Sequence, residues 1–326
     1  MRLAKLCLAV AFVCGLALFV SYSSADVIRD DRDPQSYIDL GAKYASVGRL
    51  DITQRSGKYI GSGTLISPDW VLTAGHCVDK ATALSFTVAG TTYAASSWLA
   101  YPQWRGKLTT GYDIALVHLA GASAVTPAKR YTAPSEIGLK GTFVGYGMTG
   151  TGLTGAKTFD GLKRGAENML DTYYTERRTV NNRILLADFD NPKNSRDNLF
   201  GSAIPLELEG LIAPGDSGGG LFIDLGTDTF LAGVHSFVGA YDRKADSDYG
   251  DFSGDTRVAW FNSWIDQILA ADLAGGLGGA PGGSAIGAGN VKGQMIDAAV
   301  PEPATLSLLA LGGLMLLRRR KRQTAN

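Results

Sequence analysis

The sequence predicts an all-β domain that ends in one α-helix, and three observations carry this prediction. From about residue 45 to residue 256, short runs rich in Val, Ile, Thr, Tyr and Phe alternate with Gly, Pro, Asn and Asp, which favours an antiparallel sandwich or barrel. The segment 258–269 has apolar residues at helical spacing. The Gly-rich stretch 271–299 that follows is typical of a flexible linker.

The individual elements follow from local patterns. The predicted strands include apolar runs at 59–66, 70–73, 114–119, 142–146, 221–223 and 230–238. The predicted helix gathers its apolar side chains on one face: Val258, Phe261, Trp264, Ile265 and Ile268. With 45% hydrophobic and 19% charged residues, the chain can bury a core, which excludes wholesale disorder. The 31 basic and 31 acidic residues balance, which excludes a nucleic-acid-binding protein of the basic kind.

The first 25 residues have the pattern of an export signal. Two basic residues and the apolar run 6–20 precede small residues at the positions that signal peptidase reads, Ser23 and Ala25. The alternative, a membrane anchor, is weaker because the run falls short of the ~20 residues of a spanning helix. We therefore expect cleavage after Ala25, with residues 26–44 as an amino-terminal extension.

The last 27 residues, 300–326, have three parts in a fixed order: Pro-Glu-Pro, a short apolar run and a basic cluster. This order resembles the PEP-CTERM sorting signal, which an exosortase reads. The resemblance implies a bacterial envelope protein, cut near 301–303 and delivered to the outer surface or the extracellular matrix. A plain C-terminal membrane tail is the alternative. In either case the basic cluster is expected to remain cytoplasmic.

The cysteines agree with this division of the chain. Cys7 and Cys14 lie in the predicted leader, so Cys77 is the only cysteine of the processed protein and an internal disulfide is excluded. Both ends are rich in basic residues, and their removal leaves a mildly acidic protein, which is no polyanion binder.

Three short segments carry residues suited to catalysis. His76 stands among small residues after a buried-looking strand, and Asp113 stands at the start of an apolar strand, where a carboxylate needs hydrogen-bonding partners. Ser217 lies in the run 215–220, whose glycines allow backbone N–H groups to converge on a substrate oxygen. The Gly-x-Ser-x-Gly string also matches the α/β-hydrolase elbow, but the order His, Asp, Ser excludes that fold.

Together these segments resemble the chymotrypsin/trypsin-like serine proteases, from about residue 61 to residue 269. The resemblance includes Gly145-Tyr146-Gly147, Ser236 with Phe237, and the closing helix around Trp264. It implies two antiparallel Greek-key six-stranded β-barrels, about 45–130 and 131–257, with the C-terminal helix 258–269 and the active site between the barrels.

The same resemblance implies the role of each residue. His76 is the general base, Asp113 orients it, and Ser217 attacks the carbonyl to form an acyl-enzyme. The N–H groups of Gly215 and Ser217 would form the oxyanion hole. The mechanism requires no cofactor and no metal. The expected partners are protein or peptide substrates, with signal peptidase and exosortase during processing. We expect a monomer that meets the membrane only through its sorting helix.

The sequence departs from the family pattern at several positions. Gly61 replaces a cysteine that in most relatives bridges to the one after the catalytic His, so Cys77 is expected to be a free, buried thiol. No counterpart of the family's activated amino terminus is evident upstream of Tyr44. The partner of Asp216 is therefore left open between an internal Arg or Lys and a different processed end.

The resemblance gives a less complete prediction of specificity. Leu211 and Ile212 would form an apolar floor of the primary pocket, so preference for Arg or Lys is not expected. His235 stands where glutamyl-specific relatives carry a His, which leaves a preference for Glu and a buried structural His as two alternatives. The other predicted substrate-binding residues are Ser236, Phe237 and Val238.

Two further predictions concern function outside the triad. His118 is expected to be a surface residue, and the acidic loop holding Asp242, Asp246, Asp248, Asp251 and Asp255 lacks a full calcium-ligand pattern.

The predicted function is a secreted serine endopeptidase. The alternative is an inactive protease-like fold that acts as a surface adhesion or matrix-binding module.

Overall fold

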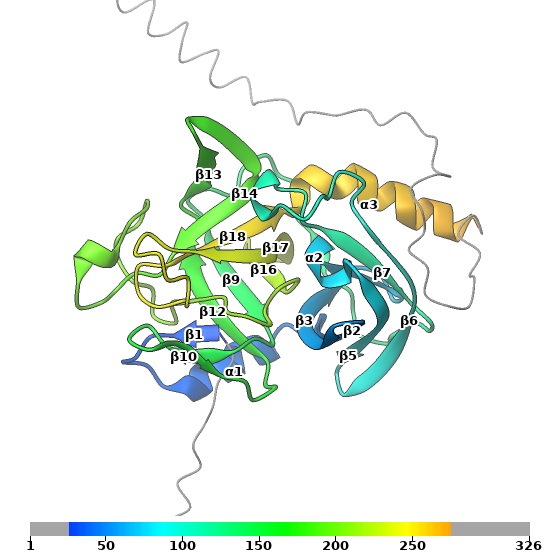
Figure 1. Ribbon diagram of the computed structural model, residues 1–326, viewed down its shortest axis with the longest axis horizontal. Helices are drawn as coiled ribbons and strands as arrows, with labels where there is room; N and C mark the ends of the chain where they lie inside the picture. Colours follow the sequence, from blue (N-terminus) through cyan, green and yellow to red (C-terminus); the bar gives the residue numbers. More distant parts are fainter. Residues whose placement is uncertain (1–25, 275–326) are drawn as a thin grey trace, which may run out of the picture.

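The computed structural model describes residues 26–274, which form two β-sheet halves with a helix along one side (Figure 1). The predicted export signal, most of the Gly-rich linker and the predicted sorting signal lie outside these residues. The three α-helices are α1 (Pro34–Ala42), α2 (Gly75–Val78) and α3 (Val258–Leu273), and the two 3-10 turns are η1 (Leu108–Thr110) and η2 (Ser195–Asp197). None of the helices in 26–274 is both long and apolar enough to cross a membrane.

The first half is a closed barrel of six antiparallel strands, as expected. Its strands are β2 (Val47–Gln54), β3 (Gly57–Leu65), β4 (Trp70–Thr73), β5 (Ala81–Val88), β6 (Thr91–Ala100) and β7 (Ala115–Leu119). The ring runs β2-β3-β4-β7-β6-β5, with β5 returning to β2. Side chains such as Leu50, Leu72, Phe86 and Leu116 are fully buried inside it. The predicted runs 70–73 and 114–119 correspond to the paired strands β4 and β7.

The second half differs from the expected second six-stranded ring. Its strands are β8 (Lys129–Arg130), β9 (Lys140–Gly145), β12 (Arg164–Met169), β13 (Thr172–Glu176), β14 (Thr179–Asp188), β16 (Gly220–Asp224), β17 (Thr229–Gly239) and β18 (Phe252–Arg257), in one eight-stranded sheet. Among the described residues no backbone ladder joins β12 to β14. The side chain of Asn168 spans this gap, because its amide donates to the Asp188 carbonyl at 2.6 Å and to the Gly210 carbonyl at 3.2 Å.

A third, four-stranded sheet lies beside the second half and includes the start of the described chain. Its order is β11 (Gly155–Thr158), β10 (Thr149–Thr151), β1 (Asp26–Ile28) and β15 (Gly210–Leu211). Residues 26–44, expected to be an extension, therefore belong to the fold through β1 and α1. The reason is burial, since Val27 and Tyr37 are 0% exposed and the Tyr37 hydroxyl donates to the Glu209 carbonyl at 3.0 Å.

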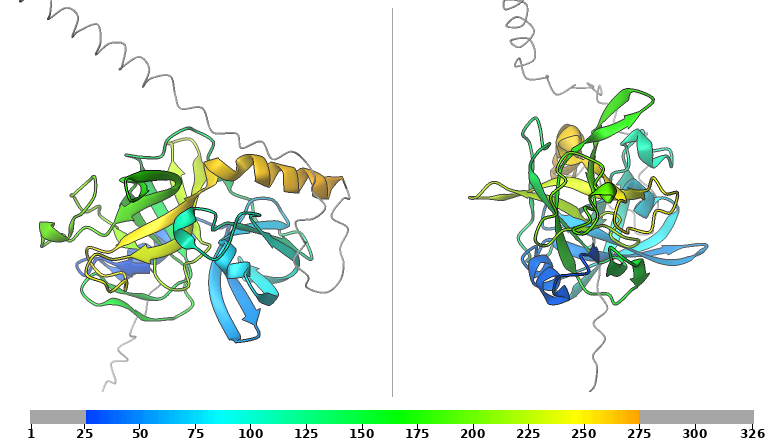
Figure 2. Two further views of the ribbon diagram at one scale, coloured as in Figure 1. Left: turned by 45° about the horizontal axis from the view of Figure 1, so that its top comes forward. Right: turned by 90° about the vertical axis from the view of Figure 1, so that its left-hand side faces the viewer.

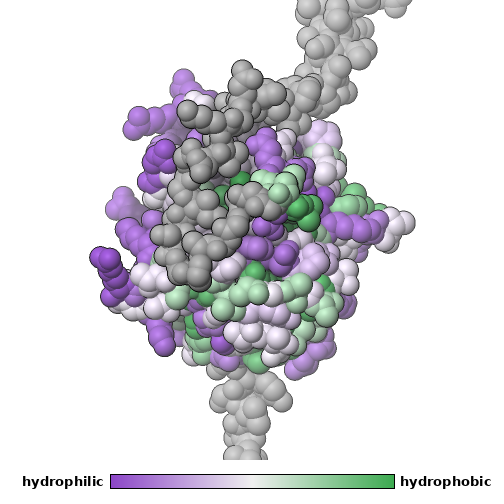
Figure 3. All heavy atoms as spheres, turned by 90° about the vertical axis from the view of Figure 1, so that its right-hand side faces the viewer, coloured by the Kyte–Doolittle hydropathy of each residue, from purple (hydrophilic) through white to green (hydrophobic). Residues whose placement is uncertain are grey.

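Helix α3 follows β18 of the second half and runs over the side of the first barrel (Figure 2). Its predicted apolar face is confirmed at Val258, Phe261, Ile265 and Ile268, which are buried, while Trp264 is half-buried and meets the edge of Tyr101. These side chains share one hydrophobic cluster with residues of both sheets. On the face of the first barrel, hydrophilic side chains are interspersed with smaller apolar patches (Figure 3).

Candidate active site

His76 and Asp113 are brought together by two elements of the first barrel. His76 lies in α2, directly after β4, and Asp113 lies two residues before β7. The His76 ring Nδ1 lies 2.7 Å from Asp113 Oδ2, and the backbone N–H of His76 donates to Asp113 Oδ1 at 2.8 Å. Because two atoms of His76 contact both carboxylate oxygens, the position and the tilt of the ring are fixed.

The Asp113 carboxylate is fully buried and receives further support from the second half of the molecule. The Ser236 hydroxyl on β17 donates to Asp113 Oδ2 at 2.6 Å. The Thr256 hydroxyl on β18 donates to the Asp113 carbonyl at 2.9 Å. A buried carboxylate is costly without such donors, so this network explains how the charge is tolerated between the two halves.

The imidazole of His76 is half-buried, with 31% of its side chain exposed. Burial of the ring opposes protonation, but Cys77 and Asp113 favour it, and the net effect raises the pKa of His76 above its ordinary value of 6.5. Within residues 26–274, Nε2 of this ring makes no hydrogen bond, so the atom that would take a proton from a nucleophile is available.

Ser217 lies at the junction of the two halves, next to the segment that carries His76. Its carbonyl accepts from the Ser62 N–H at 2.8 Å and from the thiol of Cys77, the neighbour of His76, at 3.5 Å. In the described part of the chain its hydroxyl does not form a hydrogen bond with His76. The structure thus pairs His76 with Asp113 directly and anchors Ser217 to the same region through its backbone.

Gly218 is required by this close approach. Its φ is +84°, and a Cβ there would lie 2.0 Å from the Thr73 hydroxyl oxygen. Gly215 also has a positive φ, +102°. In this turn the N–H groups of Asp216, Gly218 and Gly219 donate to backbone carbonyls, whereas those of Gly215 and Ser217 donate to no group among residues 26–274.

Gly61 and Cys77 occupy neighbouring positions, as expected for the site of a missing bridge. A Cβ at Gly61 would lie 3.2 Å from the Cys77 sulfur, and Cys77 is a free, buried cysteine.

Asp216 is fully buried and adjoins a second carboxyl that sequence reasoning missed. Its two oxygens accept from the Gly147 N–H at 2.6 Å and the Ala213 N–H at 2.8 Å. The carboxyl of Asp26, at the start of β1, lies against it. The sequence left the partner of Asp216 open, and the structure brings a residue upstream of Tyr44 against it because β1 pairs with β10 on one side and β15 on the other. Strands β1 and β10 lie side by side in Figure 1.

Among residues 26–274, no Lys or Arg forms an ion pair with the carboxyl of Asp26 or of Asp216. Burial, and then the neighbouring Asp216, raise the pKa of Asp26, while burial raises the pKa of Asp216. Arg164 acts on both electrostatically, but its guanidinium is bonded to Asp160 at 3.0 Å. No N–H or O–H among the described residues donates to the side-chain oxygens of Asp26.

The predicted specificity residues separate into a buried and a half-buried group. Leu211 is fully buried and pairs with Val27, and Ile212 is also buried. Phe237 and Val238 are half-buried, with Phe237 edge-on to Tyr174. Of the predicted specificity residues, Phe237 and Val238 are thus the partly exposed ones, while Ser236 is buried and contacts Asp113.

His235 is the buried structural residue of the two alternatives. It is 0% exposed and stacks on Phe143. Its Nδ1 lies 2.5 Å from Asp255 and its Nε2 accepts from the Val144 N–H at 3.2 Å. Since both ring nitrogens are engaged inside the protein, the geometry gives no support to recognition of a Glu side chain by His235.

A cavity of about 510 Å³ opens beside the Asp113 segment. It is lined by the 107–112 segment, including Tyr112, and by residues of the β13–β14 hairpin, including Tyr174. Tyr174 contacts Phe237, so the cavity lies on the side of the site where β17 continues past Ser236.

Comparison with known proteins shows the family of the chain. The Trypsin family model matches residues 43–265, and the PEP-CTERM protein-sorting motif matches residues 299–322. Chymotrypsin-like elastase family member 1 of the dog, Canis lupus familiaris, is 27% identical over 229 residues, covering 64% of this chain and 81% of that protein. The same protein of the cat, Felis catus, is 27% identical over 234 residues, covering 64% and 79%.

Solved structures show the same fold. HL collagenase has a TM-score of 0.54 at 19% identity, over 71% of this chain and 96% of that one. Neuropsin, a serine protease expressed in the limbic system of mouse brain, has a TM-score of 0.52 at 16% identity, over 72% and 98%. Fold and site together define a chymotrypsin-like serine endopeptidase. The chain belongs to the trypsin family.

Proposed function

We propose that the protein is an exported serine endopeptidase in which His76, Asp113 and Ser217 act as a catalytic triad. The observation that carries this proposal is the double contact of His76 with Asp113 at the point where the Ser217 backbone packs against the same barrel. The free Nε2 of His76 takes the proton of the Ser217 hydroxyl while the oxygen bonds to the substrate carbonyl carbon.

The remaining steps are those of the acyl-enzyme mechanism of serine proteases. His76 gives the proton to the amine as the carbon–nitrogen bond breaks, and water then releases the acyl group from Ser217 with His76 again as the base. The N–H groups of Gly215 and Ser217 stabilise the oxyanion, by about 3 kcal/mol for a single donor.

A serine-reactive fluorophosphonate tests the proposal directly. We expect the processed wild-type protein to be labelled on Ser217 and to cleave peptides, and Ser217→Ala to lose both properties. Ser135→Ala, at an exposed serine, is the control and should be labelled like the wild type. A folded wild type that neither reacts nor cleaves, yet binds cells or matrix, would support the alternative of an adhesion module.

We propose that the enzyme prefers small apolar residues before the scissile bond. Val238 is half-buried and places a branched side chain on the strand that follows Ser236, and the buried Leu211 and Ile212 behind it bring no acid for Arg or Lys.

Replacing Val238 by Gly is expected to widen the pocket. Cleavage of peptides with Phe before the scissile bond should gain about tenfold in kcat/KM relative to Ala peptides, because pocket contacts of this size change discrimination by about 10- to 200-fold. The measurement compares kcat/KM for peptides that differ only in Ala, Phe, Glu or Arg. An unchanged Phe to Ala ratio, or a dominant Glu peptide in the wild type, would contradict the assignment.

We propose that export processing also completes the site. Cleavage after Ala25 would create an α-ammonium group on Asp26, three bonds from a carboxyl group that lies against Asp216. It would place a cation beside the two buried acids. The φ of Asp26, +51°, is uncommon for a residue with a side chain and is no longer constrained once the preceding peptide bond is cut. The sorting motif at 299–322 supports delivery to the cell envelope, with exosortase cleavage near 301–303.

A further inference from the structure

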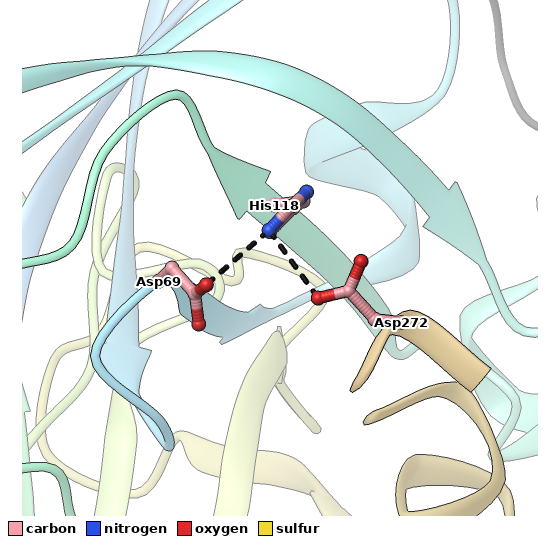
Figure 4. A group of neighbouring side chains, drawn as sticks. All are labelled: Asp69, His118 and Asp272. Carbon is pink, nitrogen blue, oxygen red and sulfur yellow. Dashed lines mark hydrogen bonds and ion pairs between the residues drawn. The ribbon is translucent and has the colours of Figure 1, made fainter. Parts of the chain in front are cut away.

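Three metal-ligating side chains from distant parts of the chain converge at the end of α3 (Figure 4). Asp69 lies in the turn before β4, His118 lies on β7, and Asp272 lies in the last turn of α3. The His118 Nε2 atom is 3.4 Å from Asp69 Oδ2 and 3.5 Å from Asp272 Oδ2. His118, expected to be a simple surface residue, is therefore part of a cluster.

The two distances are long for hydrogen bonds, whose N to O separation is about 2.7–3.2 Å. They match the edge of a tetrahedron around zinc, which is about 3.3–3.4 Å for metal–ligand bonds of about 2.0–2.1 Å. The three ligand atoms all lie within 4.8 Å of one another, so small side-chain shifts are enough to bring them around one ion.

Neighbouring groups hold these side chains in place. The Ser96 hydroxyl lies 3.2 Å from His118 Nδ1, which leaves Nε2 to face the carboxylates, and Trp70 stacks on the ring at 4.5 Å. The Trp70 indole N–H donates to Asp272 at 3.1 Å, and the Ser67 hydroxyl donates to Asp69 Oδ1 at 2.9 Å. Such outer contacts orient the ligands in zinc sites.

The two carboxylates of the cluster give a cation something to balance. With a neutral His118, Asp69 and Asp272 bring two negative charges together, and no Arg or Lys of residues 26–274 forms an ion pair with either. A divalent ion balances them. Imidazole together with carboxylates suits zinc, whereas calcium and magnesium prefer oxygen ligands alone.

We propose that Asp69, His118 and Asp272 bind a zinc ion that fastens the last turn of α3 to the first barrel. The side chains are 22–38% exposed, so water can supply the fourth ligand. The site lies where the chain leaves the described fold toward the Gly-rich stretch, and it secures that exit point. It is independent of the catalytic triad.

The test uses the full chain, stripped of metal by a chelator and dialysed against zinc. We expect one bound zinc per chain by elemental analysis, and an unfolding midpoint raised by about 5–10 °C at a free zinc concentration about 100 times the Kd. His118→Gln should weaken zinc binding at least about tenfold and abolish the shift. Asp242→Asn, at an exposed acid on another loop, is the matched control and should bind like the wild type.

Three results would overturn the proposal. The first is a wild type whose midpoint does not respond to zinc, which would identify the cluster as an ion pair only. The second is zinc binding that survives His118→Gln, which would place the ion elsewhere, such as on His76. If His118→Gln does not fold, Asp69→Asn is used instead, because Asp69 is more exposed. The third result against the proposal is that Asp69→Asn still binds zinc.

Discussion

Replacing Asp113 by Asn is expected to lower kcat about 10⁴-fold while the fold is retained. The side chain is fully buried and accepts hydrogen bonds from the backbone of His76 and from the hydroxyl of Ser236, besides its contact with the His76 ring. An amide at this position would turn an N–H group toward one of these donors or toward His76 Nδ1. The ring would then be held in the wrong tautomer to accept the Ser217 proton.

The pH profile gives an independent measurement of the same contact. The general base must be neutral, so kcat/KM rises with pH through the pKa of His76. Because Cys77 and Asp113 outweigh burial of the ring and raise this pKa above 6.5, the acid limb of the wild type should lie above that value. In Asp113→Asn the limb should move to lower pH, because the negative charge is gone.

Ser236→Ala is the control for this experiment. It removes one donor to Asp113 and leaves both contacts with His76, so we expect a loss of about tenfold, corresponding to about 1–2 kcal/mol. An acid limb that stays in place in Asp113→Asn, or activity within tenfold of the wild type, would contradict the proposed role of the carboxylate.

Retaining residues before Asp26 is expected to lower activity by about 100-fold or more. Without the α-ammonium group, Asp26 and Asp216 form a buried acid pair, and Arg164, which acts on both electrostatically, is bonded to Asp160. Leaving a buried charge without its partner costs about 3–5 kcal/mol. Asp216 lies within the turn 213–219 and immediately precedes Ser217. A shift of Asp216 caused by this cost would therefore displace the segment that carries Ser217.

The experiment compares three amino termini on the same protein: free Asp26, Asp26 preceded by one glycine, and acetylated Asp26. Only the first form carries an ammonium group on the backbone nitrogen of Asp26. Active-site titration should therefore detect active enzyme in that form and not in the other two. Equal titration of all three forms would rule out this activation step. Asp216→Asn with the free terminus tests whether the acid is the partner, and it should be as impaired as the blocked forms.

The uncut chain should also show a characteristic pH dependence of stability. Burial raises the pKa of both Asp26 and Asp216, so the folded state holds protons that the unfolded chain releases. Stability is therefore lost as the pH rises from the ordinary carboxyl value toward the raised one. The free terminus supplies a positive charge and should reduce this loss.

Local patterns in the sequence were enough to find several strands, the C-terminal helix and the triad candidates. Strand β4 coincides with its predicted run, and α3 begins at the predicted Val258 and extends four residues further. These elements could be predicted because apolar alternation, turn residues and helical spacing are local properties of the sequence. Packing of the folded chain buries the same apolar faces. The order of His76, Asp113 and Ser217 could be recognised for the same reason, since each stands in a short segment with its own small neighbours.

What packing alone decided involves residues far apart in the chain. Asp26 carries no local signal for contact with Asp216, because that contact depends on β1 inserting between β10 and β15. The position of His235 in the sequence was compatible with recognition of a Glu side chain and with a buried structural role. In the structure it is buried and contacts Asp255, which favours the structural role. The sequence thus determined which side chains are available for chemistry. The tertiary structure decided which of them share a charge environment, because electrostatic and hydrogen-bonding partners are set by proximity in space.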